Sequence, residues 1–310
     1  MRDETTIEVT STRVLPNGLR GRLVTVCAGA AIVIAAACTS VPSDPKVPFS
    51  IEFNRAPSPS VVLGDTMFDS LGVQAPLKAR VFNSSGDEII GGAVTYHVVS
   101  LANVDSTNPA FADSVPLTVD STSGLVIAKS DPAFLLDSAR VYAQAGNLQS
   151  APIVVRVTRR ADKLVASGTR DTSITLSFLN TDSLLVPAGW SFNVRVLDTT
   201  DAPLTAADSA VPFYLVRFRI VQPVNASTDT SYVMLTGNGR TRSELDTTDA
   251  SGTASRQIRI RRTKFPFDKP AVDGIIADTI LVEASAYRAG GQLVAGSGVQ
   301  FHFIVKANKL

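Results

Sequence analysis

Apolar and polar residues alternate in short stretches of this chain from Phe49 almost to its C-terminus. Alternation with a period of two places the apolar side chains on one face of a β-strand. Turn sequences such as Ser85-Gly86-Asp87 and Gly91-Gly92 separate the stretches, and no stretch has the 3.6-residue period of an amphipathic helix. Short alternating strands at this spacing predict an all-β protein built from β-sandwiches.

The strands fall into two series, and the 310 residues are enough for two sandwiches of ordinary size. The first series covers 49–158 and the second 162–306. The charged junction over 159–162 is so short that we expect the two domains to abut. The second series contains surplus residues at 180–189 and in an insertion at 264–277. Long irregular insertions in compact domains are usually functional or disordered.

Several segments resemble the motifs of bacterial Ig-like domains, which are strung along surface proteins and adhesins. In the first series these are 61–66, 80–87, 93–96 and 119–126, with Tyr96 where that family usually carries Trp. In the second series, 248–254 resembles the acidic turn before a late strand in another group of such domains. The resemblance implies two Ig-like β-sandwich domains in tandem. Turn-and-core motifs of this kind indicate a fold and not a ligand.

A basic and apolar segment precedes the sandwiches. Residues 1–22 are polar, end in arginines and predict a cytoplasmic tail or signal n-region, and the uncharged run over 23–41 predicts a signal sequence or a transmembrane anchor. The three prolines within 42–48 predict an extended tether. We therefore expect the sandwiches to follow an N-terminal membrane anchor.

Three kinds of anchor or export signal fit this segment. Small residues ending at Cys38 resemble the lipobox of bacterial lipoproteins, which implies a diacylated Cys38 and a leader cleaved before it, although Ala35 stands where Leu is most common. The run over 23–41 is also just long enough for an uncleaved single-pass helix, and plain secretion is the third alternative. All three predict an exported protein, on the periplasmic face of the inner membrane or on the cell surface, with membrane lipid as the partner of the anchor.

The residue inventory argues against an enzyme. The two cysteines, Cys27 and Cys38, both precede the sandwiches, and the two histidines, His97 and His302, each lie in an alternating strand. The chain contains neither a Gly-x-Ser-x-Gly nor a His-Glu-x-x-His motif. A net charge of +1 gives no overall attraction to nucleic acid. We therefore predict no catalytic group, no cofactor, no metal ligand, no small-molecule substrate and no nucleic-acid partner.

A basic run followed by Phe265-Pro266-Phe267 is the strongest candidate for a partner contact. The alternatives are a solvated strand face for the basic residues and a small core beneath the loop for the phenylalanines. The candidate partner contacts are Arg259, Arg261, Lys264, Phe265 and Phe267.

Together these features predict a non-catalytic, membrane-anchored structural or scaffold subunit whose Ig-like domains bridge neighbouring proteins on the periplasmic face of a membrane complex. The plan of an anchor and two β-domains also resembles the extrinsic accessory subunits of bacterial photosynthetic reaction centre–light-harvesting assemblies. The alternative is a cell-surface adhesin-like or glycan-binding lipoprotein. That alternative requires exposed aromatic side chains, whereas Trp190 falls on the apolar face of its strand.

Overall fold

The computed structural model describes residues 44–100, 114–176, 191–200, 210–223, 232–235 and 243–308. The tail, the apolar run, Cys38 and Trp190 lie outside these ranges. In the described ranges the regular structure consists of β-strands and short 3-10 helices. None of the helices in this part of the chain combines the length and the hydrophobicity needed to cross a bilayer. The prediction of an all-β fold is confirmed.

The first domain has a main sheet with the strand order β2-β9-β7-β4, in which β2 runs parallel to β9. The two-stranded sheets β1-β3 and β5-β6 form the opposite layer, and β8 pairs with β7. The bounds are β1 (Ser50–Phe53), β2 (Ser60–Val62), β3 (Ala79–Phe82), β4 (Thr95–Ser100), β5 (Leu117–Val119), β6 (Val126–Ala128), β7 (Ser138–Ala145), β8 (Leu148–Gln149) and β9 (Ile153–Thr158), with a 3-10 turn at Pro132–Phe134.

The core of the first domain follows from the alternation. Every second residue of β7 is buried, and Val141 packs in one cluster with Leu117 and Val126 of the opposite layer. Tyr96 is buried at the position where the resembled family carries Trp, and its hydroxyl accepts a hydrogen bond from the Ala79 N–H at 3.2 Å. Gly124 has φ +76°, and a Cβ there would lie 3.0 Å from the Tyr96 ring. The turn glycine of the 119–126 motif is therefore required by close packing.

The second domain has two sheets, with the strand orders β10-β12-β16-β14 and β11-β18-β17-β13-β15. If β10, β12, β13, β14, β16, β17 and β18 are lettered A to G, these orders contain the ABED and GFC sheets of the immunoglobulin fold. The bounds are β10 (Lys163–Ser167), β11 (Asp171–Leu176), β12 (Ser191–Leu197), β13 (Leu215–Gln222), β14 (Val233–Leu235), β15 (Ser243–Thr247), β16 (Thr253–Ile260), β17 (Ile275–Ser285) and β18 (Val299–Asn308), with the 3-10 turns η3 (Arg262–Lys264) and η4 (Ala289–Gly291).

Aromatic rings fill the centre of the second sandwich. The ring centroid of Phe192 lies 5.3 Å from that of Phe218, 5.4 Å from that of Phe301 and 5.7 Å from that of Phe303. The four residues come from three strands, β12 of one sheet and β13 and β18 of the other, so this cluster joins the two layers. The alternation of β12 and β13 predicts these inward faces correctly.

The insertion predicted at 264–277 is shorter in the structure. Ile275, Ile276 and Ala277 belong to β17, where they pair with the end of β18. Ile276 is fully buried, which explains why the strand begins directly after Gly274. Irregular chain is confined to the residues between η3 and that glycine.

Candidate functional site

The structure corrects the expectation for two of the candidate partner contacts. Phe265 is 4% exposed, and its ring packs edge-on against those of Tyr232 and Phe267, with centroids at 5.3 and 5.2 Å. Arg261 is 8% exposed, and its guanidinium lies 3.9 Å from the sulfur of Met234. Both side chains are therefore part of the domain interior and not surface contacts.

The physical reason is that the strand period ends before these residues. β16 stops at Ile260 and the chain turns into η3, so alternation no longer decides which side chain faces water. Arg259 and Lys264 are exposed, and Phe267 is half-buried against the core. The small-core alternative therefore describes Phe265, while Arg259 and Lys264 remain accessible.

The irregular segment is also fastened to the body of the domain. Asp278 accepts hydrogen bonds from the Tyr232 hydroxyl at 2.8 Å and from Lys269 Nζ at 2.7 Å. Burial, reinforced by Asp278, raises the pKa of Tyr232 well above its usual range, so the phenol stays a donor. This segment is consequently a packed cover over one end of the second domain.

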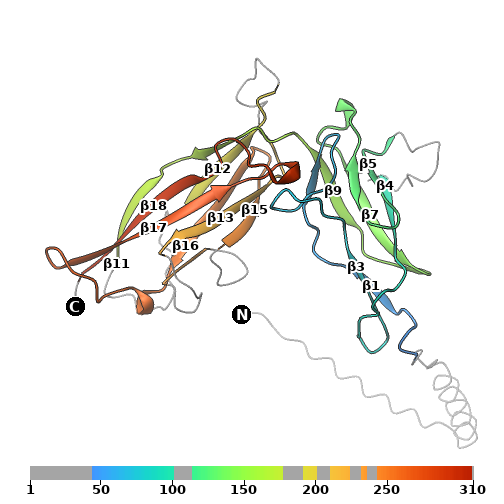
Figure 1. Cartoon of the computed structure of the whole chain (residues 1–310), viewed down its shortest axis with the longest axis horizontal. Coiled ribbons are helices and arrows are strands. Elements are labelled where there is room, and N and C mark those ends of the chain that lie inside the picture. The colour runs from blue at the N-terminus through green and yellow to red at the C-terminus, as the bar shows by residue number, and fades with distance from the viewer. Residues whose placement is uncertain are drawn as a thin grey trace, which may run out of the picture.

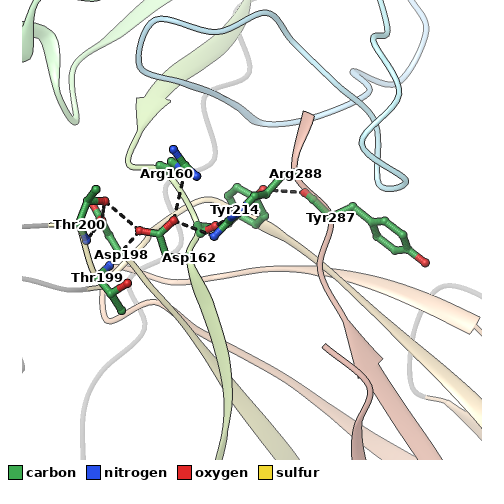
Figure 2. Close-up of polar contacts among 9 residues, drawn as sticks. Arg160, Asp162, Asp198, Thr199, Thr200, Tyr214, Tyr287 and Arg288 are labelled. Atoms are coloured by element: carbon green, nitrogen blue, oxygen red, sulfur yellow. Dashed lines mark hydrogen bonds and ion pairs between the residues drawn. The ribbon is translucent and has the colours of Figure 1, made fainter. Parts of the chain in front are cut away.

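A network of polar contacts lies instead at the junction of the two domains (Figure 2). Arg288, which follows β17, donates from Nε to the Ala161 carbonyl at 2.6 Å. It also forms an ion pair with Asp162 Oδ1 at 2.7 Å, and Arg160 contacts the same oxygen at 3.2 Å. The other oxygen of Asp162 accepts from the Thr199 N–H and the Thr200 hydroxyl. The linker is therefore fastened to the second domain on both sides of the Asp162 carboxylate.

The electrostatics of this network favour an ionised Asp162. Burial by itself would raise the pKa of the Asp162 carboxyl. The hydrogen bonds from Thr200 and Thr199, together with the charges of the two arginines, outweigh burial and hold the pKa below its usual value of 3.8. The carboxylate is thus charged at neutral pH and matched to the guanidinium groups around it.

Direct contacts then join the first domain to the second. The Ser60 hydroxyl donates to the Phe213 carbonyl at 2.6 Å, and the Thr158 hydroxyl donates to the Pro212 carbonyl at 2.5 Å. Thr158 is fully buried. Because a buried hydroxyl without a partner is costly, these two bonds favour the observed docking over a separated arrangement.

An aromatic contact lies beside these bonds. Phe68 of the first domain belongs to the core cluster of the second, with its ring centroid 6.1 Å from that of Tyr214. The Tyr214 hydroxyl donates to the Tyr287 carbonyl at 2.6 Å, and burial raises the pKa of Tyr214 beyond its usual range. A pocket of about 340 Å³ opens between the domains here, lined among others by Val62, Asp65, Phe68, Arg160, Tyr214 and Arg288.

The backbones of the two domains also meet directly. The Gly291 N–H donates to the Gly72 carbonyl at 3.1 Å. A Cβ on Gly72 would lie 1.9 Å from the Arg288 carbonyl oxygen, and the φ of Gly72 is +74°. Only glycine permits both this conformation and this approach. In Figure 1 the loop after β17 meets the first domain at this point.

The groups gathered at the junction are suited to fixing the orientation of one domain relative to the other, because backbone carbonyls, hydroxyls and an ion pair bind one another there. The described ranges contain no cluster of three or more His, Cys, Asp or Glu side chains placed to hold a metal ion. The sequence predicts that the domains abut but does not identify Gly72, Phe68 or Arg288. The turn pattern around Gly72 was the only signal available, and a turn pattern does not reveal a distant partner.

Comparisons with known proteins do not place the chain in a family. No family model matches the chain, and no curated protein matches it in sequence. Among solved structures, the adhesin InvE of Yersinia pseudotuberculosis aligns at 12% identity and a TM-score of 0.28, over 83% of this chain and 58% of the adhesin. The chain thus spans little more than half of that protein.

Two other solved structures align at similar levels. Domains 5-6 of the S-layer protein SbsC align at 11% identity and a TM-score of 0.26, over 84% of this chain and 98% of that one. Immunoglobulin domains 1-5 of Sidekick-1 align at 14% identity and a TM-score of 0.23, over 83% and 39% of the two chains. The assignment of this chain as an all-β pair of Ig-like sandwiches rests on its own strand order.

We predict that Gly72→Ala opens the junction. The linker bond after Arg160 is a trypsin site, but Ala161 is buried and its carbonyl is bound to Arg288. Cleavage there requires local opening, so the variant should be cut roughly tenfold faster than the wild type under native conditions. Gly91→Ala is the matched control, because Gly91 has φ +75° and nothing within 4 Å of its added Cβ. Equal cleavage rates for both variants would contradict the assigned role of Gly72.

A second prediction concerns pH. Because the pKa of Asp162 is lower in the folded chain than in the unfolded one, its stabilising contribution is complete above the usual value of 3.8 and is lost as the pH falls through the folded pKa. The melting temperature of Asp162→Asn should therefore lie below that of the wild type at about pH 7, and the difference should shrink toward about pH 3. A difference that stays constant over this range would contradict the ionised pairing.

Proposed function

We propose that this protein is a non-catalytic, exported scaffold. An N-terminal anchor at residues 23–41 or at Cys38 holds the chain at a membrane, and the two Ig-like domains bridge neighbouring proteins at its periplasmic face or on the cell surface. Membrane lipid is the partner of the anchor, and other proteins of a membrane complex are the partners of the sandwiches.

The fastened junction carries this proposal. A bridging protein must hold its contact surfaces at a fixed separation, because a freely hinged pair of domains loses effective concentration at the second site. Here Arg288 binds both the Ala161 carbonyl and the Asp162 carboxylate of the linker. Across the junction, the Gly72 carbonyl accepts a hydrogen bond from the backbone of the second domain. A membrane anchor would add to this effect by confining the chain to a surface.

The second candidate is an adhesin-like or glycan-binding surface protein, and the stacked rings of His97 and Tyr142 are the aromatic pair to weigh for it. Their centroids are 5.0 Å apart with planes at 17° on the outward face of the first domain. Sugar-binding platforms use open ring faces, whereas each of these rings covers one face of the other. We therefore place the bridging role first and leave the glycan role to experiment.

The anchor is tested by two cysteine variants of the full chain in the cells that produce it. We predict that Cys38→Ser prevents acylation and releases or mislocalises the mature chain, whereas Cys27→Ser leaves it in the membrane fraction. Mass spectrometry of the wild type should find a lipidated N-terminus at residue 38. Retention of Cys38→Ser with an intact Met1 would show a spanning segment instead, and a soluble wild type would contradict the anchor altogether.

The bridging role is tested by purification of native membranes after crosslinking in intact cells. We expect neighbours in fixed stoichiometry, and a chain that migrates alone would contradict the proposal. The narrower prediction of a photosynthetic reaction centre–light-harvesting assembly requires migration with pigment. Binding to immobilised glycans without protein neighbours would establish the second candidate.

A further inference from the structure

The pocket between the two domains is lined by an acidic residue from one side and by basic residues from the other. Val62 and Asp65 of the first domain contribute to it, as do Arg160 of the linker and Arg288 of the second domain. Its volume is about 340 Å³. Sites for small molecules begin at about this size and occur preferentially at domain interfaces. The pocket is therefore large enough for a small molecule that contacts both domains.

Asp65 is the acidic group of this pocket. Its side chain is half-buried, and its Oδ1 accepts a hydrogen bond from the Thr66 N–H at 2.7 Å. Among the residues that the structure describes, Asp65 forms no ion pair. A half-buried carboxylate that keeps acceptor capacity favours a ligand group with a positive charge and N–H donors.

The two arginines contribute N–H donors from the other side (Figure 2). Arg288 uses Nε for the Ala161 carbonyl and Nη2 for the Asp162 carboxylate, and its Nη1 has no partner within the described part of the chain. Arg160 contacts Asp162 through Nε at 3.2 Å, and its side chain is 61% exposed. Guanidinium groups bind carboxylates through several donors at once. This side of the pocket is therefore suited to a negatively charged ligand group.

Tyr214 also lines the pocket, and charges from both domains act on its phenol. Burial is the main reason that the pKa of Tyr214 is raised. The positive charge of Arg288 opposes this effect, whereas the negative charges of Asp65 and Asp162 reinforce it. Asp65 and Arg288 thus both lie within electrostatic range of one side chain, which confirms that the two charges share a small space.

The pocket is formed without a ligand, because backbone hydrogen bonds hold its walls. The Asp65 N–H donates to the Val62 carbonyl at 2.9 Å, and the Arg288 N–H donates to the Gln292 carbonyl at 2.7 Å. Val62 and Phe68 pack against the core of the second domain and give the pocket an apolar part. A preformed site of this kind does not lose affinity to reorganisation when a ligand binds.

We propose that this pocket binds a small dipolar molecule that carries an ammonium and a carboxylate group on an apolar body, which is the chemistry of a free amino acid such as leucine. The ammonium group pairs with Asp65, and the carboxylate accepts hydrogen bonds from Arg160 and Arg288. The apolar body lies against Val62 and Phe68. The molecule is a bound ligand and not a substrate, so this inference goes beyond the bridging function. Because it contacts both domains, it stabilises their docked arrangement.

Calorimetric titration of the purified full chain tests the charge pattern with three probes of one shape. L-leucine carries both charges, 4-methylpentanoate lacks the ammonium group and 3-methylbutylamine lacks the carboxylate. We expect leucine to bind roughly tenfold or more tightly than either analogue, because each analogue leaves one side of the pocket without its partner. Equal binding of the three probes, or no binding of leucine, would overturn the proposal.

One pair of variants assigns the ammonium group to Asp65. Asp65→Asn should raise the dissociation constant of leucine about tenfold and leave that of 4-methylpentanoate unchanged. Asp137→Asn is the matched control, because Asp137 also accepts the N–H of the next residue, Ser138, at 2.7 Å and does not line the pocket. An asparagine oxygen can keep this backbone bond in both variants. Equal effects of the two substitutions on leucine binding would contradict the assignment.

A second measurement places the ligand at the junction. Trypsin cleavage after Arg160 requires local opening, so a ligand that binds only the docked arrangement slows it. Leucine at about nine times its dissociation constant should slow the cut about tenfold in the wild type, and about twofold in Asp65→Asn at the same concentration. A short arginine peptide in the same tube should be cut at an unchanged rate. Leucine binding that leaves the cleavage rate unaltered would place the ligand elsewhere and overturn the proposal.

These results are independent of the bridging test. If leucine fails to bind while the chain still purifies with fixed neighbours, the pocket is wrong and the scaffold function stands. If leucine binds through Asp65 but the chain migrates alone from native membranes, the scaffold function fails while the ligand site remains.

Discussion

The arrangement of the two domains depends on the contacts of Arg288 with the linker. Its guanidinium binds the Ala161 carbonyl and the Asp162 carboxylate, and so fixes the direction in which the chain enters the second sandwich. Removal of one partner of a partly buried ion pair leaves the other charge without compensation, which costs more than the intact pair contributes. We infer that this pair serves geometry more than stability, since it determines one docking of the domains among several that a short linker permits.

That geometry connects the fold to the proposed function. Sandwich domains present flat sheet faces, and a fixed junction holds the faces of two domains at a defined separation. Phe213 shows this directly, because it belongs to the second domain and yet covers one end of the sheet of the first. A pair of domains held in this way is therefore suited to the bridging role proposed above.

The sequence predicted those parts of the structure that depend on local pattern. Alternation of period two assigned Phe192 and Phe218 to inward faces, and turn residues such as Gly124 marked strand ends. It failed for Arg261, and for Phe265 it left a partner contact and a small core both open, because the strand ends before these residues and tertiary packing decides their burial. The contacts at the junction could not be predicted from local sequence pattern for the same reason. Nothing in the sequence around Gly72 indicates that Arg288 lies against it.

The central claim is that the two sandwiches form one rigid unit, and residual dipolar couplings test it most directly. Amide couplings of the two domains, measured in one alignment medium, report the orientation of each domain and the amplitude of motion between them. The account predicts that both domains share a single alignment tensor, with couplings that fit the relative orientation in Figure 1. Two tensors of different magnitude would show that the domains reorient independently, and would contradict the account.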